Sequence, residues 1–179
     1  MKTIVVPAKE QVSADAQAIF EQIQKKLGKV PNLYATIGYS ADALKAFLGF
    51  DASFAHTAFS EKEKEAINLI VSEVNNCNYC LAAHTMLATM KGYSKEDTLG
   101  FRRGNAADAK LDTAVKLAKS IAENKGDADV QLKENFFNAG YDEKALIDLI
   151  GLITVRSFTN YVYATTQVPI DFPVAEALN

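Results

Sequence analysis

The chain has 179 residues, of which 49% are hydrophobic and 23% charged, with nine glycines and four prolines. This length and composition are those of one ordinary globular domain, and they argue against disorder. The formal net charge is −3, and no run of Lys or Arg exceeds two residues, so binding to nucleic acid or to an anionic membrane is not expected. The sequence predicts a single domain over residues 1–179.

The apolar segments of the sequence predict a cytoplasmic protein. The first ten residues contain only a four-residue apolar stretch, far shorter than the apolar region of a signal peptide. The most apolar segment, 145–155, is interrupted by Asp148 and Gly151 and is followed by Arg156. It is too short and too interrupted for a bilayer span.

Helix signals follow one another along the first half of the chain, and strand signals are almost absent. Serines and glycines placed as caps delimit most of these segments. In chain order, we expect a helix from Ser13 to about Leu27 with Gly28 beyond its end, a short helical turn over 31–38, and a helix over 41–54 preceded by Ser40.

The capping pattern continues through the rest of the chain. Ser60 and Glu63 form a capping box for a helix over 61–74, and Asn75 or Asn76 can cap the next helix, through Lys91 to Gly92. Later helices are expected to start at Ser94, Asp108, Asp127 and Asp142, with stops at Gly126 and Gly140 and the last helix ended by Pro169 and Pro173. About eight helices joined by short loops predict a compact all-α fold.

The chain has only two cysteines, Cys77 and Cys80, and they stand three residues apart. A close pair in a reducing compartment is a candidate for redox or metal chemistry. If Asn75 or Asn76 is the cap, both cysteines lie in the first turn, where free amides and the helix dipole favour an anion. This position lowers the pKa of a thiol and makes it reactive.

His84 stands four residues after Cys80, so the two side chains share a helix face. The imidazole can take the thiol proton directly or through a water. A thiolate that attacks a peroxide becomes a sulfenic acid, and Cys77 is close enough to condense with it into a disulfide. The cycle then requires an external dithiol.

A third group is expected to orient the histidine. Two glutamates of the preceding helix are candidates, because Glu65 borders its apolar arc and Glu73 lies within that arc. Burial there would raise a carboxyl pKa and suit it to proton transfer. Periodicity alone does not choose between the two.

Together these residues resemble a known family. A glutamate, twelve residues to Cys-x-x-Cys, and a histidine four beyond it are similar to the alkylhydroperoxidase D family of the carboxymuconolactone decarboxylase-like superfamily. The segments 30–33 (Val-Pro-Asn-Leu) and 170–173 (Ile-Asp-Phe-Pro) resemble its peroxidase-related branch. The resemblance implies that Cys80 attacks the peroxide, Cys77 resolves the product, and His84 and Glu65 form the proton relay, with Glu65 ranked above Glu73 by its spacing.

The resemblance also implies an alkylhydroperoxidase D-like fold and a homo-oligomer such as a dimer, trimer or hexamer. The implied partners are a small hydroperoxide substrate and a lipoyl-type or thioredoxin-like dithiol reductant, with no cofactor and no metal. The sequence departs from the family pattern at Tyr79, where the well-studied branch has a second histidine, and at Tyr163 and Ala164, where many members have an Asn-His pair.

The sequence therefore predicts an enzyme, a thiol-dependent peroxidase, and three alternatives stay open. The same cysteine pair could serve a disulfide reductase or isomerase. The protein could also be a zinc-binding or redox-sensing module without turnover, and zinc would require a fourth ligand from His56 or a carboxylate. Muconolactone decarboxylation is less favoured, because that branch does not rely on the cysteine pair. No Gly-rich strand-to-helix turn supports a flavin or nicotinamide site.

Overall fold

The structure is a computed structural model that describes residues 3–178. This part of the chain forms helices and no strands, which confirms the predicted all-α fold. In order, the elements are the 3₁₀ turn η1 (Lys9–Gln11), α1 (Ala14–Leu27), α2 (Asn32–Ile37), α3 (Ala41–Ser53), the 3₁₀ turn η2 (Phe54–His56), α4 (Glu63–Val74), α5 (Asn78–Met90), α6 (Lys95–Arg103), α7 (Ala109–Glu123), α8 (Val130–Asn138) and α9 (Glu143–Thr166).

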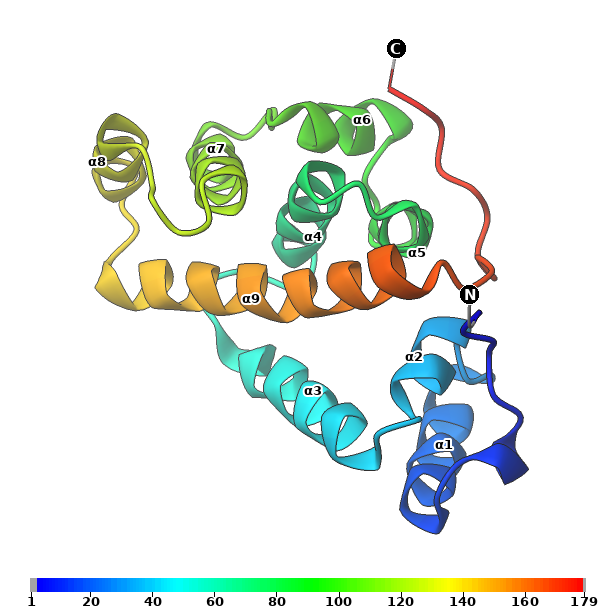
Figure 1. Cartoon of the computed structure of the whole chain (residues 1–179). Coiled ribbons are helices and arrows are strands. Elements are labelled where there is room, and N and C mark those ends of the chain that lie inside the picture. The colour runs from blue at the N-terminus through cyan, green and yellow to red at the C-terminus, as the bar shows by residue number, and fades with distance from the viewer. Residues whose placement is uncertain (1–2, 179) are drawn as a thin grey trace.

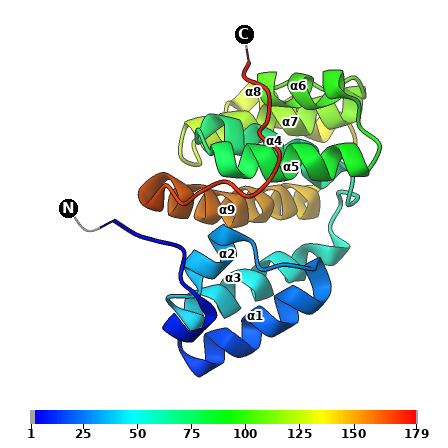
Figure 2. The same ribbon diagram turned by 90° about the vertical axis from the view of Figure 1, so that its right-hand side faces the viewer.

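The long helix α9 runs through the middle of the molecule. Helices α4 to α8 lie on one side of it and α1 to α3 on the other (Figures 1 and 2). The segment after α9 then runs back along α5 toward the end of α6 (Figure 2). The site described below lies where α9, α5 and α2 meet, and both cysteines belong to the apolar cluster that α1, α2 and α3 share with α5 and α9.

α9 covers most of the segment predicted between Asp142 and Pro169, and it extends well beyond the apolar segment 145–155. Its 24 residues are enough, by length and apolar composition alone, to cross a membrane. In the fold, however, α9 packs against α2, α3, α4, α5 and α7. Asp148 and Gly151 do not interrupt it, because a helix held by packing on several sides tolerates single unfavourable residues.

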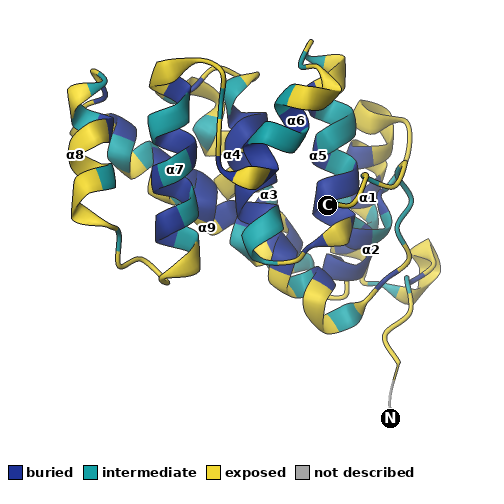
Figure 3. Cartoon of the chain, turned by 90° about the horizontal axis from the view of Figure 1, so that it is seen from above, coloured by how far each residue is buried: buried dark blue, intermediate teal, exposed yellow. Residues whose placement is uncertain are grey.

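α4 is the most deeply buried helix, and every residue from Lys64 to Ser72 is buried. It packs against α5, α6, α7 and α9, and its position inside the molecule is visible from above (Figure 3). A polar side chain on α4 is therefore enclosed by protein. This is why Glu65 and Asn68 lie in the interior rather than in solvent.

The predicted boundaries agree closely at Ser13, Ser40, Ser94, Asp108 and Asp142, since each of these side chains accepts a hydrogen bond at its helix start. Ser60 and Glu63 form the expected reciprocal hydrogen bonds. The first α-helical residue of α4 is nevertheless Glu63, not Glu61, because Glu61 and Lys62 form a turn.

Three predicted boundaries were wrong. α8 is capped by Asp129 instead of Asp127, because the Asp129 carboxylate accepts from the amide of Leu132. α9 ends at Thr166, before Pro169, where Gln167 adopts a left-handed conformation. Neither Asn75 nor Asn76 caps α5: Asn75 ends α4, and the cap is Cys77 itself.

Candidate active site

The cysteine pair occupies the N-terminus of α5. Asn76 has a φ of 53°, a left-handed conformation that asparagine tolerates better than most residues, and it turns the chain sharply between α4 and α5. Cys77 then caps α5, because its Sγ accepts a hydrogen bond from the backbone amide of Cys80 at 3.2 Å. The two cysteines are joined as a disulfide, with Cα atoms 5.3 Å apart, and both are buried.

Glu65 and His84 form a buried pair between α4 and α5. The Nδ1 atom of His84 lies 2.6 Å from Oε2 of Glu65, and these residues are 7% and 3% exposed. The other carboxylate oxygen, Oε1, accepts a hydrogen bond from Nζ of Lys91 at 2.6 Å. Both oxygens of Glu65 therefore have a partner, and the histidine ring is held by its Nδ1 side.

The electrostatics of this pair assign the imidazole tautomer. Burial favours a raised pKa for Glu65, but the charge and hydrogen bond of His84 and the contacts with Lys91 lower that pKa to about 2. Burial lowers the pKa of His84, and the charge of Arg156 lowers it further against the opposing effect of Glu65. At neutral pH the carboxylate is ionised and the imidazole is neutral. Nδ1 then donates its proton to Glu65, and Nε2 keeps its lone pair as a base.

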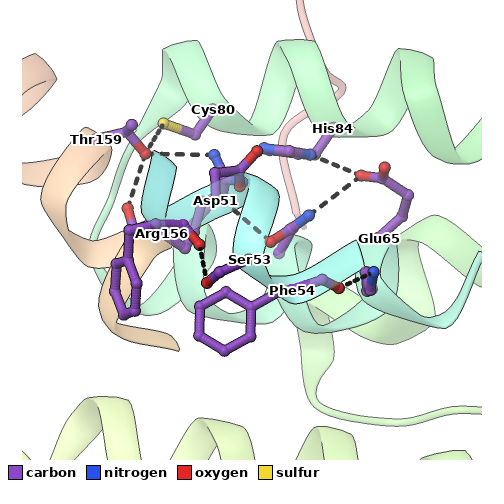
Figure 4. Close-up of polar contacts among 12 residues, drawn as sticks. Asp51, Ser53, Phe54, Glu65, Cys80, His84, Arg156 and Thr159 are labelled. Carbon is purple, nitrogen blue, oxygen red and sulfur yellow. Dashed lines mark hydrogen bonds and ion pairs between the residues drawn. The ribbon is translucent and has the colours of Figure 1, made fainter. Parts of the chain in front are cut away.

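Sequence analysis missed a second group of polar residues at the site. Arg156 on α9 donates from Nε to Oδ1 of Asn68 at 3.1 Å and from Nη1 to Oγ1 of Thr159 at 3.3 Å. The same Thr159 oxygen lies 3.9 Å from Sγ of Cys80. Figure 4 shows these contacts running from Cys80 through Thr159 and Arg156 toward Glu65.

A signal for this group was present in the sequence. Arg156 and Thr159 are three residues apart on one face of a strongly apolar helix. A charged residue within such a face is seldom buried without a function or a partner. The other partners, Asn68 and Cys80, come from other helices, so periodicity within α9 could not identify them.

A pocket of about 430 Å³ opens beside the cysteine pair. Cys80, His84, Arg156 and Thr159 all contribute to its lining. The remaining charged residues of its lining are Lys26 and Lys29. The other walls are largely apolar and consist of Leu27, Pro31, Leu33, Tyr34, Tyr79, Ala83, Met86, Leu87, Met90 and Phe172. The arrangement can therefore hold an apolar molecule against the sulfur of Cys80.

Tyr79, which stands between the cysteines, connects α5 to two distant segments. Its hydroxyl donates to Oδ1 of Asp171 at 2.5 Å and accepts from the amide of Leu33 at 3.2 Å. Its ring lies edge-on to Phe172, with ring centroids 5.5 Å apart. Burial and the hydrogen bond to Asp171 raise the pKa of Tyr79 far above its ordinary value, so it stays protonated.

The structure places the two candidate glutamates in different surroundings. Glu65 contacts His84, whereas Oε2 of Glu73 pairs with Nε of Arg102 at 2.6 Å. Among residues 3–178, no three His, Cys, Asp or Glu side chains are grouped as a metal site would require. His56, offered from sequence as a fourth zinc ligand, lies on the turn η2 with an exposed side chain.

Comparison with known proteins agrees with this fold. Residues 41–124 match the carboxymuconolactone decarboxylase family, a segment that contains the glutamate, both cysteines and the histidine. None of the curated protein sequences is significantly similar to the chain. The match covers 84 of the 179 residues, and over that segment it confirms the predicted resemblance to the carboxymuconolactone decarboxylase-like family.

Three solved structures illustrate the likeness. An uncharacterised peroxidase-related protein from Silicibacter sp. TM1040 is 23% identical, with a TM-score of 0.79 over 90% of this chain and 87% of that chain. An alkylhydroperoxidase AhpD core protein from Ralstonia eutropha JMP134 is 18% identical, with a TM-score of 0.78 over 89% and 87%. The debrominase Bmp8 C82A, in complex with 2,3,4-tribromopyrrole, is 22% identical, with a TM-score of 0.79 over 96% and 93%. At these identities the likeness establishes the fold.

Proposed function

We propose that the protein is a thiol-dependent peroxidase that reduces organic hydroperoxides through Cys80 and Cys77. One observation carries the proposal: Cys80 borders an apolar pocket that is also lined by His84, whose neutral imidazole is held at its Nδ1 side by an ionised glutamate. A nucleophile, a base and a group that orients the base are the parts such chemistry requires. The family match is consistent with this activity.

The proposed cycle begins with the reduced pair. Nε2 of His84 takes the proton of the Cys80 thiol, directly or through a water, and the sulfur anion attacks the terminal oxygen of the hydroperoxide. The O–O bond breaks, the sulfur becomes a sulfenic acid, and the departing alkoxide takes a proton from the imidazolium to leave as an alcohol.

The thiol of Cys77 then attacks Sγ of Cys80, forming the disulfide and releasing water. An external dithiol reduces this disulfide and is itself oxidised to a disulfide. The net reaction converts one hydroperoxide and one dithiol into one alcohol, one water and one disulfide. The 5.3 Å separation of the Cα atoms already suits the disulfide, so resolution requires little backbone movement.

The pocket favours a hydroperoxide with an apolar body. Leu33, Leu87 and Phe172 are among the side chains that would contact such a body beside the sulfur. Burial of apolar surface is favourable in proportion to its area, so an organic hydroperoxide gains binding energy that hydrogen peroxide lacks. We further propose a lipoyl-type or thioredoxin-like dithiol as reductant, in a homo-oligomer of the reducing cytoplasm.

The test is consumption of cumene hydroperoxide by the full chain with dihydrolipoamide or thioredoxin as reductant. The wild type is expected to turn over, to lose two thiols together and to prefer cumene hydroperoxide to hydrogen peroxide. Cys80→Ser is expected to be inactive. Cys77→Ser keeps a cap for α5, because a serine hydroxyl also accepts from the amide. That variant is expected to form a sulfenic acid that dimedone traps on Cys80. Full activity in Cys80→Ser would refute the assignment of the nucleophile.

The same assay separates the alternatives. A disulfide reductase or isomerase would reduce insulin or reshuffle a scrambled substrate faster than it consumes peroxide. A redox sensor would oxidise once and show no turnover with any dithiol. Because a debrominase shares the fold, 2,3,4-tribromopyrrole with the same dithiols is a further substrate to include, and bromide release without peroxide consumption would replace the peroxidase proposal.

A further inference from the structure

Arg156 is a buried cation whose close partners are neutral. The residue is only 7% exposed, and its guanidinium bonds to the amide oxygen of Asn68 and the hydroxyl of Thr159. Within residues 3–178, the only carboxylate within 4.0 Å of the guanidinium is that of Asp51, at this limiting distance, and its side chain is 47% exposed. The nearby Glu65 carboxylate is instead engaged by His84 and Lys91.

A buried charge without a close opposite charge is unusual, because the loss of hydration is not offset by pairing. The other buried arginine, Arg102, shows the ordinary arrangement, with Nε 2.6 Å from the carboxylate of Glu73. The charge of Arg156 therefore requires another explanation. Its pocket contains a group that gains negative charge only when the disulfide is reduced.

That group is the sulfur of Cys80. Sγ of Cys80 and Nη1 of Arg156 both lie within 4 Å of the same Thr159 oxygen. In the disulfide the sulfur is neutral, and the Thr159 hydroxyl donates to the backbone oxygen of Arg156 at 2.8 Å. In the reduced protein an ionised Cys80 would place a negative charge beside the guanidinium, and the Thr159 hydroxyl could turn to donate to the sulfur.

We propose that Arg156 is the counter-ion of the Cys80 sulfur anion and positions Thr159 against that sulfur, so that the site is electrostatically complete only in its reduced form. The inference rests on the proposed redox cycling of the pair and adds a positioning residue on α9. An ionised sulfur paired with a guanidinium in a poorly hydrated pocket is stabilised more strongly than in water. The same stabilisation makes the disulfide a better oxidant, because it favours the reduced form.

Other ionisable groups near Cys80 also affect its ionisation. His84 shares α5 with it, Tyr34 comes from α2, Asp51 from α3 and Glu65 from α4, while Lys26 and Lys29 line the same pocket. Lys29 is paired with Asp171 at 3.0 Å, and Glu65 with Lys91. Among these groups, Arg156 is the buried cation that shares a hydroxyl contact with the sulfur, and its substitution is expected to have the largest effect among the cations.

The experiment measures the ionisation of Cys80 without any peroxide. In a Cys77→Ser background, the rate of iodoacetamide alkylation is followed against pH for Arg156→Met, Arg156→Lys and Thr159→Val, with thermal melts to verify folding. Arg156→Met is expected to raise the pKa of Cys80 by about one unit or more, so that alkylation near neutral pH slows about tenfold. Arg156→Lys is expected to retain most of the effect, and Thr159→Val to shift the pKa by a smaller amount in the same direction.

A second measurement uses the intact cysteine pair in dithiothreitol redox buffers. Arg156→Met is expected to lower the reduction potential of the disulfide, and Arg102→Met is the control for loss of a buried arginine away from the sulfur. An unchanged alkylation profile and potential in a folded Arg156→Met protein would overturn the inference. These readouts are independent of peroxide turnover: a shifted pKa in a protein that consumes no peroxide would retain the role of Arg156 and reject the peroxidase proposal.

Discussion

Nδ1 of His84 lies 2.6 Å from Oε2 of Glu65, across the interface of α5 and α4, although the two residues are 19 positions apart in sequence. The carboxylate fixes which imidazole nitrogen carries the proton. Lys91 binds the other carboxylate oxygen, and despite burial His84 and then Lys91 hold the pKa of Glu65 well below its ordinary value. Two consecutive helices thus bring together the carboxylate and imidazole that we propose as the proton relay, and the buried pair is accessible from the pocket through His84.

His84→Ala is expected to slow peroxide reduction about a hundredfold at neutral pH, because the base that takes the thiol proton is lost. The loss is expected to shrink as pH rises, since the Cys80 thiol then ionises without help. The measurement is the pH dependence of kcat/KM with cumene hydroperoxide. His56→Ala, a change at the other and exposed histidine, is expected to leave the profile unaltered. A His84→Ala profile parallel to that of the wild type would remove His84 from the mechanism.

The ionisation of Glu65 makes the stability of the fold depend on pH. Its pKa falls from an ordinary 4.5 to about 2 in the folded chain, so its contribution is complete above pH 4.5 and is lost as pH falls toward 2. The linked change is at most about 3 kcal/mol. Urea unfolding between pH 6 and 3 is expected to show a smaller loss of stability in Glu65→Gln than in the wild type. Glu61→Gln, at a mostly exposed carboxylate, is the control, and equal slopes in all three proteins would contradict the prediction.

The Tyr79 hydroxyl is expected to stabilise the fold by joining α5 to α2 and to the C-terminal segment. Tyr79→Phe leaves the Leu33 amide and the Asp171 carboxylate without this partner, at an expected cost of about 1–3 kcal/mol. Chemical denaturation measures the loss. Tyr39→Phe removes a single exposed hydrogen bond, to the backbone oxygen of Val5, and is expected to cost less than about 0.5 kcal/mol. Equal losses of stability in the two variants would show that the buried hydrogen bonds of Tyr79 contribute no more than the exposed one of Tyr39.

Gly151 is expected to be required where α9 passes the ring of Phe54. A Cβ atom at this position would overlap that ring, so Gly151→Ala must shift the ring or the helix, at about 1–3 kcal/mol. Gly49, within α3, has no atom within 4 Å of an added Cβ. Gly49→Ala is therefore expected to stabilise the protein by about 0.5–1 kcal/mol, because alanine favours the helix. Thermal melts of the two variants should move in opposite directions.

How well the sequence predicted the structure differs from residue to residue. Ser13, Ser40 and Ser94 marked their helices correctly, because a cap is a contact between near neighbours in the chain. Cys77 was placed one position too far into its helix. Its sulfur acts as the cap, and asparagine is the more common choice at such a position.

Glu65 and Glu73 could not be separated by periodicity, since both belong to the inner side of α4. The packing of the helices distinguishes them. Glu65 faces α5 and contacts His84, whereas Glu73, farther along α4, forms an ion pair with Arg102 of α6. The spacing shared with the family already favoured Glu65. That spacing gave no indication of Arg156, whose partners lie 88 residues earlier on α4 and 3 residues onward on α9.

The amino-acid sequence by itself determined the helical class, most helix starts, and the placement of two cysteines at a helix start with a histidine one turn after the second. These features depend on local spacing, because caps, dipoles and helix faces involve residues at most a few positions apart. Only the tertiary structure decided which carboxylate orients His84 and which apolar walls border Cys80. It also decided that, within residues 3–178, the only carboxylate within 4.0 Å of the buried Arg156 is that of Asp51, at this limiting distance. Each of these depends on contacts between helices, whose relative positions are set by packing of the whole chain.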